Sequence, residues 1–105
     1  MPMWMTPIDV ASFLTQVVSH VSQRLGIPDF ELKSATELMK EIADKDGRVS
    51  DALLDFALAY EEWYAVHERI ERAGHSEKRQ ALLVERVRNR DAARAALKAT
   101  LARYE

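Results

Sequence analysis

Six bulky residues in the second half of the chain recur at alternating intervals of three and four positions. Since an α-helix turns once every 3.6 residues, that spacing places them on one face of a single helix. The row consists of Leu53, Phe56, Tyr60, Trp63, His67 and Ile70. A second apolar flank of the same stretch is formed by Leu54, Leu58 and Ala65. So wide an apolar arc predicts a central helix that is contacted from two sides.

The composition supports a helical fold class. The 105 residues include 3 Gly, 3 Pro and no Cys, and 48% of them are hydrophobic. A β-sandwich or barrel needs more turns than so few Gly and Pro residues provide. The absence of Cys excludes disulfides, thiolate catalysis and metal–thiolate sites. No secretory signal or transmembrane stretch is recognisable, so we expect a cytoplasmic protein that does not enter a membrane.

Capping signals divide the chain into four helices. The N-cap candidates are Thr6, Ser34, Ser50 and Ser76, and the stop signals are Gly26, Gly47 and Gly74. We therefore expect one all-α domain over residues 1–105, with an apolar lead at 1–6 and helices at 7–25, 35–45, 51–73 and 77–103. Only a short turn separates the last two helices, so they should form a long antiparallel hairpin on which the two shorter helices pack.

The expected helices differ too much in length to form one even bundle. We expect the last helix to extend past the two short helices and to expose Leu97, Leu101 or Tyr104. Pairing with a second copy, or docking on another protein, would bury these side chains. The pattern therefore predicts a homodimer or a complex with a partner protein.

Charge is distributed unevenly along the chain. Residues 1–75 carry 7 basic and 13 acidic side chains, a net charge of −6, whereas residues 76–105 carry 8 basic and 4 acidic ones, a net charge of +4. Arg86, Arg90 and Arg94 continue a stripe that begins at Arg79. A hairpin folded about residue 75 would bring it to Tyr60, Tyr64 and the carboxylates of Glu61, Glu68 and Glu71. We expect ion pairs across the hairpin; the alternative is a surface that binds nucleic acid or an acidic partner.

Aromatic and methionine side chains gather in two places. Phe56, Tyr60, Trp63 and Tyr64 form one cluster, which we expect to be core; the alternative is that at least one ring anchors a partner. The other is the N-terminal lead with Met1, Met3, Trp4 and Met5, which is apolar enough to dock on the bundle or on another subunit.

Residues 39–56 resemble a helix-turn-helix motif. Ala43, Gly47 and Leu53 occupy the positions of its small residue, turn glycine and buried aliphatic residue. The resemblance implies a nucleic-acid-binding regulator that uses this corner, or the basic last helix. Because Asp51 and Asp55 would repel phosphate, a simple corner in a helical bundle is our preferred interpretation.

Three patterns raise the alternative of an ion site. Asp44, Asp46 and Gly47 match the middle of an EF-hand loop, but Ile42 and Leu53 stand where that loop needs oxygen ligands. His67 and His75 could share a metal with Glu71, although the position of His67 favours a packed core residue.

Carboxylate pairs are the third pattern. Glu41 with Asp44, and Glu68 with Glu71, resemble the pairs of small all-α nucleotide pyrophosphatases, which implies a metal-dependent hydrolase as a further alternative. Both pairs also fit a solvated helix face. We predict no catalytic residue, no bound metal and no cofactor.

The combined features favour a non-enzymatic protein–protein interaction module, an adaptor, regulator or inhibitor that self-associates through its hairpin. Nucleic-acid binding is the first alternative and a metal-dependent hydrolase the second. The residues expected to form or support the interaction surface are Trp4, Trp63, Tyr64, Arg86, Arg90, Arg94, Leu101 and Tyr104.

Overall fold

The computed structural model describes residues 6–104, and all regular structure within this range is helical. The all-α fold class is therefore confirmed. The helices are α1 (Pro7–Arg24), α2 (Ala35–Lys45), α3 (Gly47–Ala73) and α4 (Glu77–Leu101). Two short 3-10 segments, Phe30–Leu32 and Ala102–Tyr104, precede α2 and follow α4. The molecule is elongated, with extents of 50 × 25 × 23 Å.

The first two helices begin at reciprocal capping boxes. The Thr6 hydroxyl accepts a hydrogen bond from the Asp9 amide, and the Asp9 carboxylate accepts one from the Thr6 amide, both at 3.2 Å. Ser34 and Glu37 repeat this arrangement at the start of α2. After α1, Gly26 takes a positive φ of 72°, a backbone conformation that favours glycine.

The third helix begins four residues before the expected position. The Asp46 carboxylate accepts a hydrogen bond from the Arg48 amide at 3.1 Å, so Asp46 is the N-cap of α3. Ser50, the expected cap, lies inside the first turn, where its hydroxyl donates to the Gly47 carbonyl. Because Asp46 also ends α2, one residue joins the two helices.

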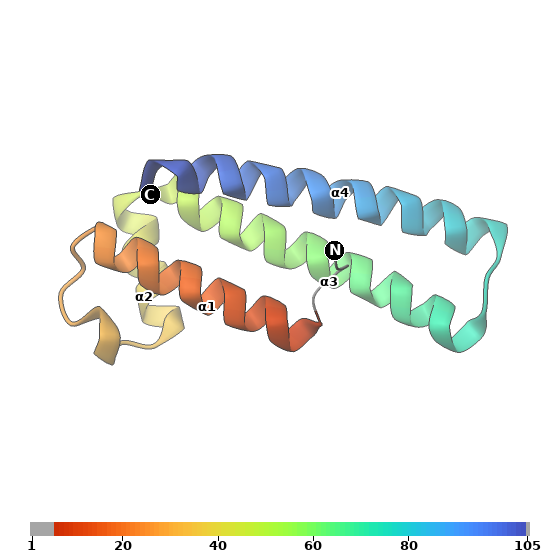
Figure 1. The fold of residues 1–105 in the computed structure, drawn as a ribbon, viewed down its shortest axis with the longest axis horizontal. Coiled ribbons are helices and arrows are strands. Elements are labelled where there is room, and N and C mark those ends of the chain that lie inside the picture. Colours follow the sequence, from red (N-terminus) through yellow and green to blue (C-terminus); the bar gives the residue numbers. More distant parts are fainter. Residues whose placement is uncertain (1–5, 105) are drawn as a thin grey trace.

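The two long helices lie side by side and antiparallel (Figure 1). Gly74 ends α3 with a positive φ of 85°, and the Ser76 hydroxyl accepts a hydrogen bond from the Arg79 amide to start α4. This turn is the far end of the molecule. α1 and α2 pack beside the opposite end, where α3 begins and α4 finishes (Figure 1).

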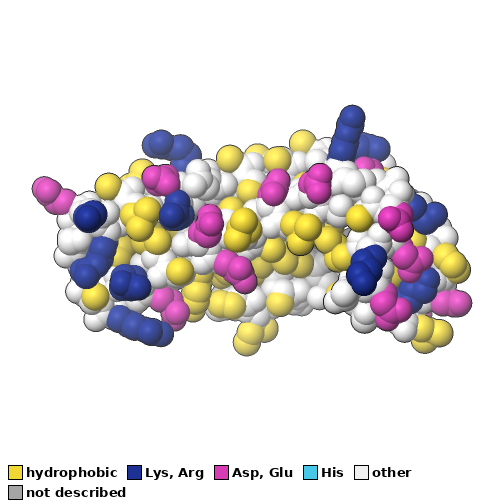
Figure 2. Space-filling model, turned by 180° about the vertical axis from the view of Figure 1, so that it is seen from behind, with side chains coloured by type: hydrophobic (Ala, Val, Ile, Leu, Met, Phe, Trp, Pro, Cys, Tyr) yellow, Lys and Arg dark blue, Asp and Glu magenta, His cyan; other side chains and the backbone are white. Residues whose placement is uncertain are grey.

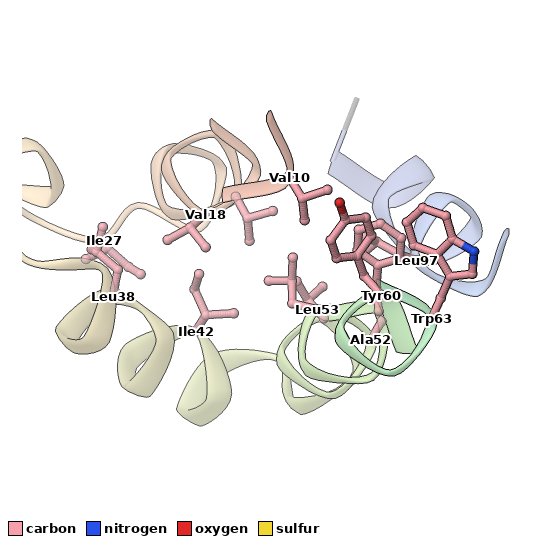
Figure 3. Close-up of a cluster of buried hydrophobic side chains, with 13 residues drawn as sticks. Val10, Val18, Ile27, Leu38, Ile42, Ala52, Leu53, Tyr60, Trp63 and Leu97 are labelled. Atoms are coloured by element: carbon pink, nitrogen blue, oxygen red, sulfur yellow. The ribbon is translucent and has the colours of Figure 1, made fainter. Parts of the chain in front are cut away.

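The core lies at that covered end. Val21, Ile42, Val49 and Phe56 are fully buried, and Leu97 of α4 is only 1% exposed. Figure 3 shows side chains from all four helices that meet in this cluster. The row that predicted α3 supplies its side of the core, because Leu53, Phe56, Tyr60, Trp63 and Ile70 are buried.

The expectation that α4 extends past the short helices and exposes its last turns is wrong. Leu97 is buried, and Leu101 and Tyr104 pack on the core. The cause is the connection at Asp46, which places α2 beside the start of α3. An antiparallel α4 ends at the same place, so the uncovered part of the hairpin is its turn.

Candidate interaction surface

The half of the hairpin near the Gly74 turn has no other helix beside it within residues 6–104 (Figure 1). The solvent side of α3 carries the flank of Leu54, Leu58 and Ala65, which we call the outer row. It begins with Leu54 beside the two short helices and reaches the half near the turn at Ala65. Leu54 is 60% exposed and Leu58 is 56% exposed. Apolar side chains that adjoin one another on an exposed helix face are one mark of an interaction site. The outer row is therefore the leading candidate for a docking surface.

A hollow of about 460 Å³ lies at the turn end of the outer row. Ala65, Val66 and Leu82 form its apolar part, and Arg69, Lys78 and Arg79 surround it. We call this feature the tip hollow. Its residues come from α3, α4 and the turn between them, so the hairpin alone builds it.

The other end of the outer row borders an apolar groove between the first three helices. Leu14, Val18, Met39 and Leu53 line this groove together with Leu54, and its volume is about 190 Å³. Leu54 therefore protrudes where three helices meet. In Figure 2, apolar side chains run along the middle of one face with carboxylates among them.

The two ends of the outer row differ in charge. Asp51 and Asp55 accompany Leu54 and Leu58 on the exposed side of α3, whereas the cations of the tip hollow lie at the turn. In Figure 2, Lys and Arg side chains gather at the left, where the turn lies, and also at the right, while carboxylates lie along the middle and at both ends. Within residues 6–104, Asp51, Asp55, Arg69 and Lys78 form no ion pair. Their charges are available to a partner.

Three of the predicted site residues meet in one cluster between α3 and α4. The Arg90 guanidinium lies 4.5 Å from the ring centre of Trp63, and its Nη2 donates to the Asp91 carboxylate at 3.1 Å. Tyr64 continues the cluster, with its ring stacked on Tyr60 at 6.0 Å. Burial lowers the pKa of Arg90 and raises the pKa of Tyr60.

This cluster is core more than surface. Arg90 is 3% exposed and Trp63 is buried, while Tyr64 is half-buried. The expectation that Arg90 lies near Tyr60 agrees with the structure, but its charge faces the Trp63 ring, not solvent. A cation in this position stabilises the hairpin by packing and by cation–π attraction.

The other arginines of the stripe take separate roles. Arg79 donates to the carbonyls of Ala73 and Gly74 at 3.2 and 3.0 Å, so it closes the end of α3. Arg86 pairs with its neighbour Glu85 at 2.7 Å, and Arg94 is exposed.

The expected pairing across the hairpin is wrong for Arg86, Glu68 and Glu71, because their ion pairs lie within single helices. Glu68 pairs with Arg72 and Glu71 with His67, each across one helical turn. Glutamates at such spacing reach a partner on their own helix with less loss of side-chain freedom.

Leu101 and Tyr104 lie at the far side of the molecule from the tip hollow. Leu101 lines a shallow hollow with Phe13, Val17 and His20 of α1. The Tyr104 hydroxyl donates to the Asp46 carboxylate, and its carbonyl is 2.7 Å from His20 Nε2. These residues hold the chain's own helices together.

Asp46 is the centre of that attachment. Its carboxylate also pairs with Arg103 at 3.2 Å. The hydrogen bond from Tyr104, followed by the charge of Arg103, lowers the pKa of Asp46, and the same hydrogen bond raises the pKa of Tyr104. Trp4, the remaining predicted site residue, lies outside the described residues.

The alternative ion and nucleic-acid sites find little support in the geometry. Within residues 6–104, no three His, Asp or Glu side chains are placed to hold a metal. Asp46, proposed for an EF-hand loop, is engaged by Tyr104 and Arg103. The corner at Asp46 has one residue between its helices, whereas a helix-turn-helix turn has three or four.

None of the helices in the described range combines the length and apolar content that crossing a bilayer requires.

Sequence reasoning missed the outer row as a surface. The spacing of Leu54, Leu58 and Ala65 marks this flank, but so wide an apolar arc predicts a helix that is covered on both sides. The acidic neighbours Asp51 and Asp55 were the signal that one side stays in solvent, because carboxylates are rarely buried without a partner.

No known protein-family description matches the chain, and neither a curated protein nor a solved structure is similar to it.

Proposed function

We propose that this chain is a non-enzymatic protein-interaction module whose docking surface is the outer row together with the tip hollow. The exposure of Leu54 and Leu58 on the solvent side of α3 carries the proposal. Apolar side chains at helical spacing beside free charges are typical of a helix that receives another protein.

The docking surface lies on a helix that the rest of the molecule holds in place. α3 is anchored at one end by the core around Phe56 and held to α4 by Trp63 and Arg90. A rigid helix loses little conformational freedom on binding, so even a small apolar surface supports useful affinity.

Removal of the apolar character of the outer row tests the proposal. We expect the double variant Leu54→Lys/Leu58→Lys to lose binding to protein partners, including a second copy, by at least tenfold. The measurement is the mass of complexes formed by the purified 12.0 kDa chain alone and after capture from native lysate. Thermal unfolding of the variant should stay close to the parent, because both side chains already face water.

The matched control is Ile8→Lys/Leu32→Lys. Both side chains are more exposed than the two leucines but lie elsewhere on the molecule. The control should bind as the parent does. Equal binding by all three proteins, or a parent chain that binds neither itself nor another protein, contradicts the proposal.

A further inference from the structure

The docking face carries opposite charges at its two ends. Asp51 and Asp55 lie beside the protruding Leu54, and Arg69 and Lys78 lie beside the tip hollow. Twelve residues separate Leu54 from Val66 in the hollow, which corresponds to about 18 Å along the helix. The face therefore presents an apolar protrusion with negative charge at one end and an apolar depression with positive charge at the other.

We propose that two copies of this chain pair antiparallel through this face, with Leu54 of each copy seated in the tip hollow of the other. This inference rests on the proposed function and names the partner. In a two-fold symmetric contact, whatever one copy offers at one end meets the other end of its partner. Antiparallel pairing thus brings Asp51 and Asp55 to Arg69 and Lys78 twice.

Other arrangements fit the charges less well. A parallel pair would place carboxylates on carboxylates and cations on cations. A partner helix of uniformly basic character would suit Asp51 and Asp55 but would be repelled by the cations of the tip hollow. The opposite sign of the two ends is what selects a second, reversed copy, although the exposed Glu61 and Glu62 between those ends repel each other across the two-fold axis.

The pairing is expected to be modest in strength. A strip about 18 Å long on one helix covers a small area. A standard interface buries roughly 800 Å² per partner. The paired charges are exposed and screened by salt, so they select the orientation more than they add affinity. We expect dissociation in the micromolar range that weakens as salt increases.

Charge reversal tests the arrangement. Asp51→Lys/Asp55→Lys and Arg69→Glu/Lys78→Glu should each associate at least tenfold more weakly than the parent, measured by sedimentation equilibrium at low salt. An equimolar mixture of the two variants should regain association to within a few-fold of the parent, because both of its contacts are again between opposite charges. A chain with all four reversals should also pair with itself.

Asp44→Lys and Arg88→Glu are the matched controls, since both side chains are exposed and lie away from the docking face. They should self-associate as the parent does. A parent chain that stays monomeric at 200 µM, or a mixture that fails to regain association, overturns the inference.

The two proposals fail in distinguishable ways. If the parent stays monomeric but Leu54→Lys/Leu58→Lys loses capture of another protein, antiparallel pairing is wrong and the docking surface stands. If the leucine substitutions change no binding at all, both proposals fall.

The same geometry predicts a gain of affinity. The midpoint between Leu54 and Val66 falls at residue 60, so the exposed Glu61 and Glu62 of both copies approach each other near the two-fold axis. Glu62→Gln should relieve this repulsion and strengthen self-association by about two- to fivefold. Unchanged or weaker association would contradict the antiparallel register.

Discussion

Arg90 is a cation buried inside a helical hairpin. Its contact with Trp63 joins α4 to α3 and so contributes to the packing of the two helices. The guanidinium is 3% exposed and lies over the indole ring. Its aliphatic stem fills space that alanine would leave empty. The arginine is thus a structural residue, although its charge made it a candidate for nucleic-acid binding.

We expect Arg90→Ala to lower the free energy of unfolding by about 2–4 kcal/mol, through lost packing and lost cation–π attraction. Chemical denaturation monitored by Trp fluorescence gives the measurement. Arg88→Ala on the exposed side of α4 is the control and should change stability by less than about 0.5 kcal/mol. Equal effects of the two substitutions would show that Arg90 is not buried in solution.

The hydrogen bond from Tyr104 to Asp46 makes stability depend on pH. The folded-state pKa of Asp46 is lowered, chiefly by this bond, so the carboxylate stabilises the fold above about pH 4 and that contribution is lost as pH falls further. Tyr104→Phe should reduce stability by about 1–2 kcal/mol at pH 7 and less in strong acid. The loss of stability on acidification should therefore be shallower in the variant.

Tyr64→Phe is the control for this prediction, since Tyr64 is also half-buried but packs through its ring. Urea unfolding at pH 7 and at pH 3 measures both proteins. A Tyr104→Phe protein with the parent's full pH dependence would show that Asp46 owes its lowered pKa to other groups.

Residue patterns predicted the neighbours of Arg90 but not its role. Folding the hairpin about residue 75 placed Arg90 near Tyr60, and the structure agrees to within one helical turn. Whether Arg90 meets a carboxylate of α3 or the Trp63 ring depends on the rotation of α4 about its axis. That rotation is set by packing along the whole helix, which local spacing does not encode.

The connection at Asp46 governs the arrangement of the helices. One residue ends α2 and caps α3, and the same carboxylate receives Tyr104 and Arg103 from the end of the chain's described part. So short a joint fixes the direction of α3 relative to α2.

Two serine substitutions distinguish the observed caps from the expected ones. Ser34→Ala should cost about 1 kcal/mol, because Ser34 caps α2 and accepts from the Glu37 amide. Ser50→Ala should cost less than about 0.5 kcal/mol, since Ser50 lies inside α3 where alanine has the higher helix propensity. Thermal unfolding compares the two, and a larger loss for Ser50→Ala would place the start of α3 at residue 51.

The helix ends show where sequence reasoning reaches its limit. Thr6, Ser34 and Ser76 each precede a helix as expected, because their flanking residues offered no competing cap. Before α3, Asp46 and Ser50 were equally suitable by chemistry. Burial of Val49 decided between them, since α3 must already be helical there to place Val49 in the core.

Packing density differs between the two ends of the molecule. The covered end holds the core of four helices, whereas the turn end consists of two helices only within the described range. Local opening is easier where fewer apolar contacts are lost.

We expect backbone amides at 65–72 and 81–88 to exchange hydrogen faster than those at 53–60, when measured by mass spectrometry at low micromolar concentration. The comparison of 65–72 with 53–60 is made within α3, and 81–88 gives the matching measurement on α4. Equal protection along α3 would mean that the turn end is stabilised by something besides its own two helices.

For the molecule as a whole, the composition predicts the fold class but does not predict where the exposed surface lies. Unequal helix lengths correctly indicated that part of the hairpin stays uncovered. The part of the hairpin that stays uncovered depends on the direction of the chain at Asp46, and that direction is a property of the tertiary structure. The residues expected to be exposed at the end of α4 are therefore buried or half-buried.

The attachment of Tyr104 to Asp46 has a consequence for how the protein is made. Leu97 and Tyr104 complete a core whose other members come mostly from the first 63 residues. The ribosome synthesises those residues first, and their side chains lack the contacts with Leu97 and Tyr104 until the end of α4 has been synthesised. The nascent chain therefore exposes apolar surface throughout translation, and its fold closes only after residue 104 has left the ribosome.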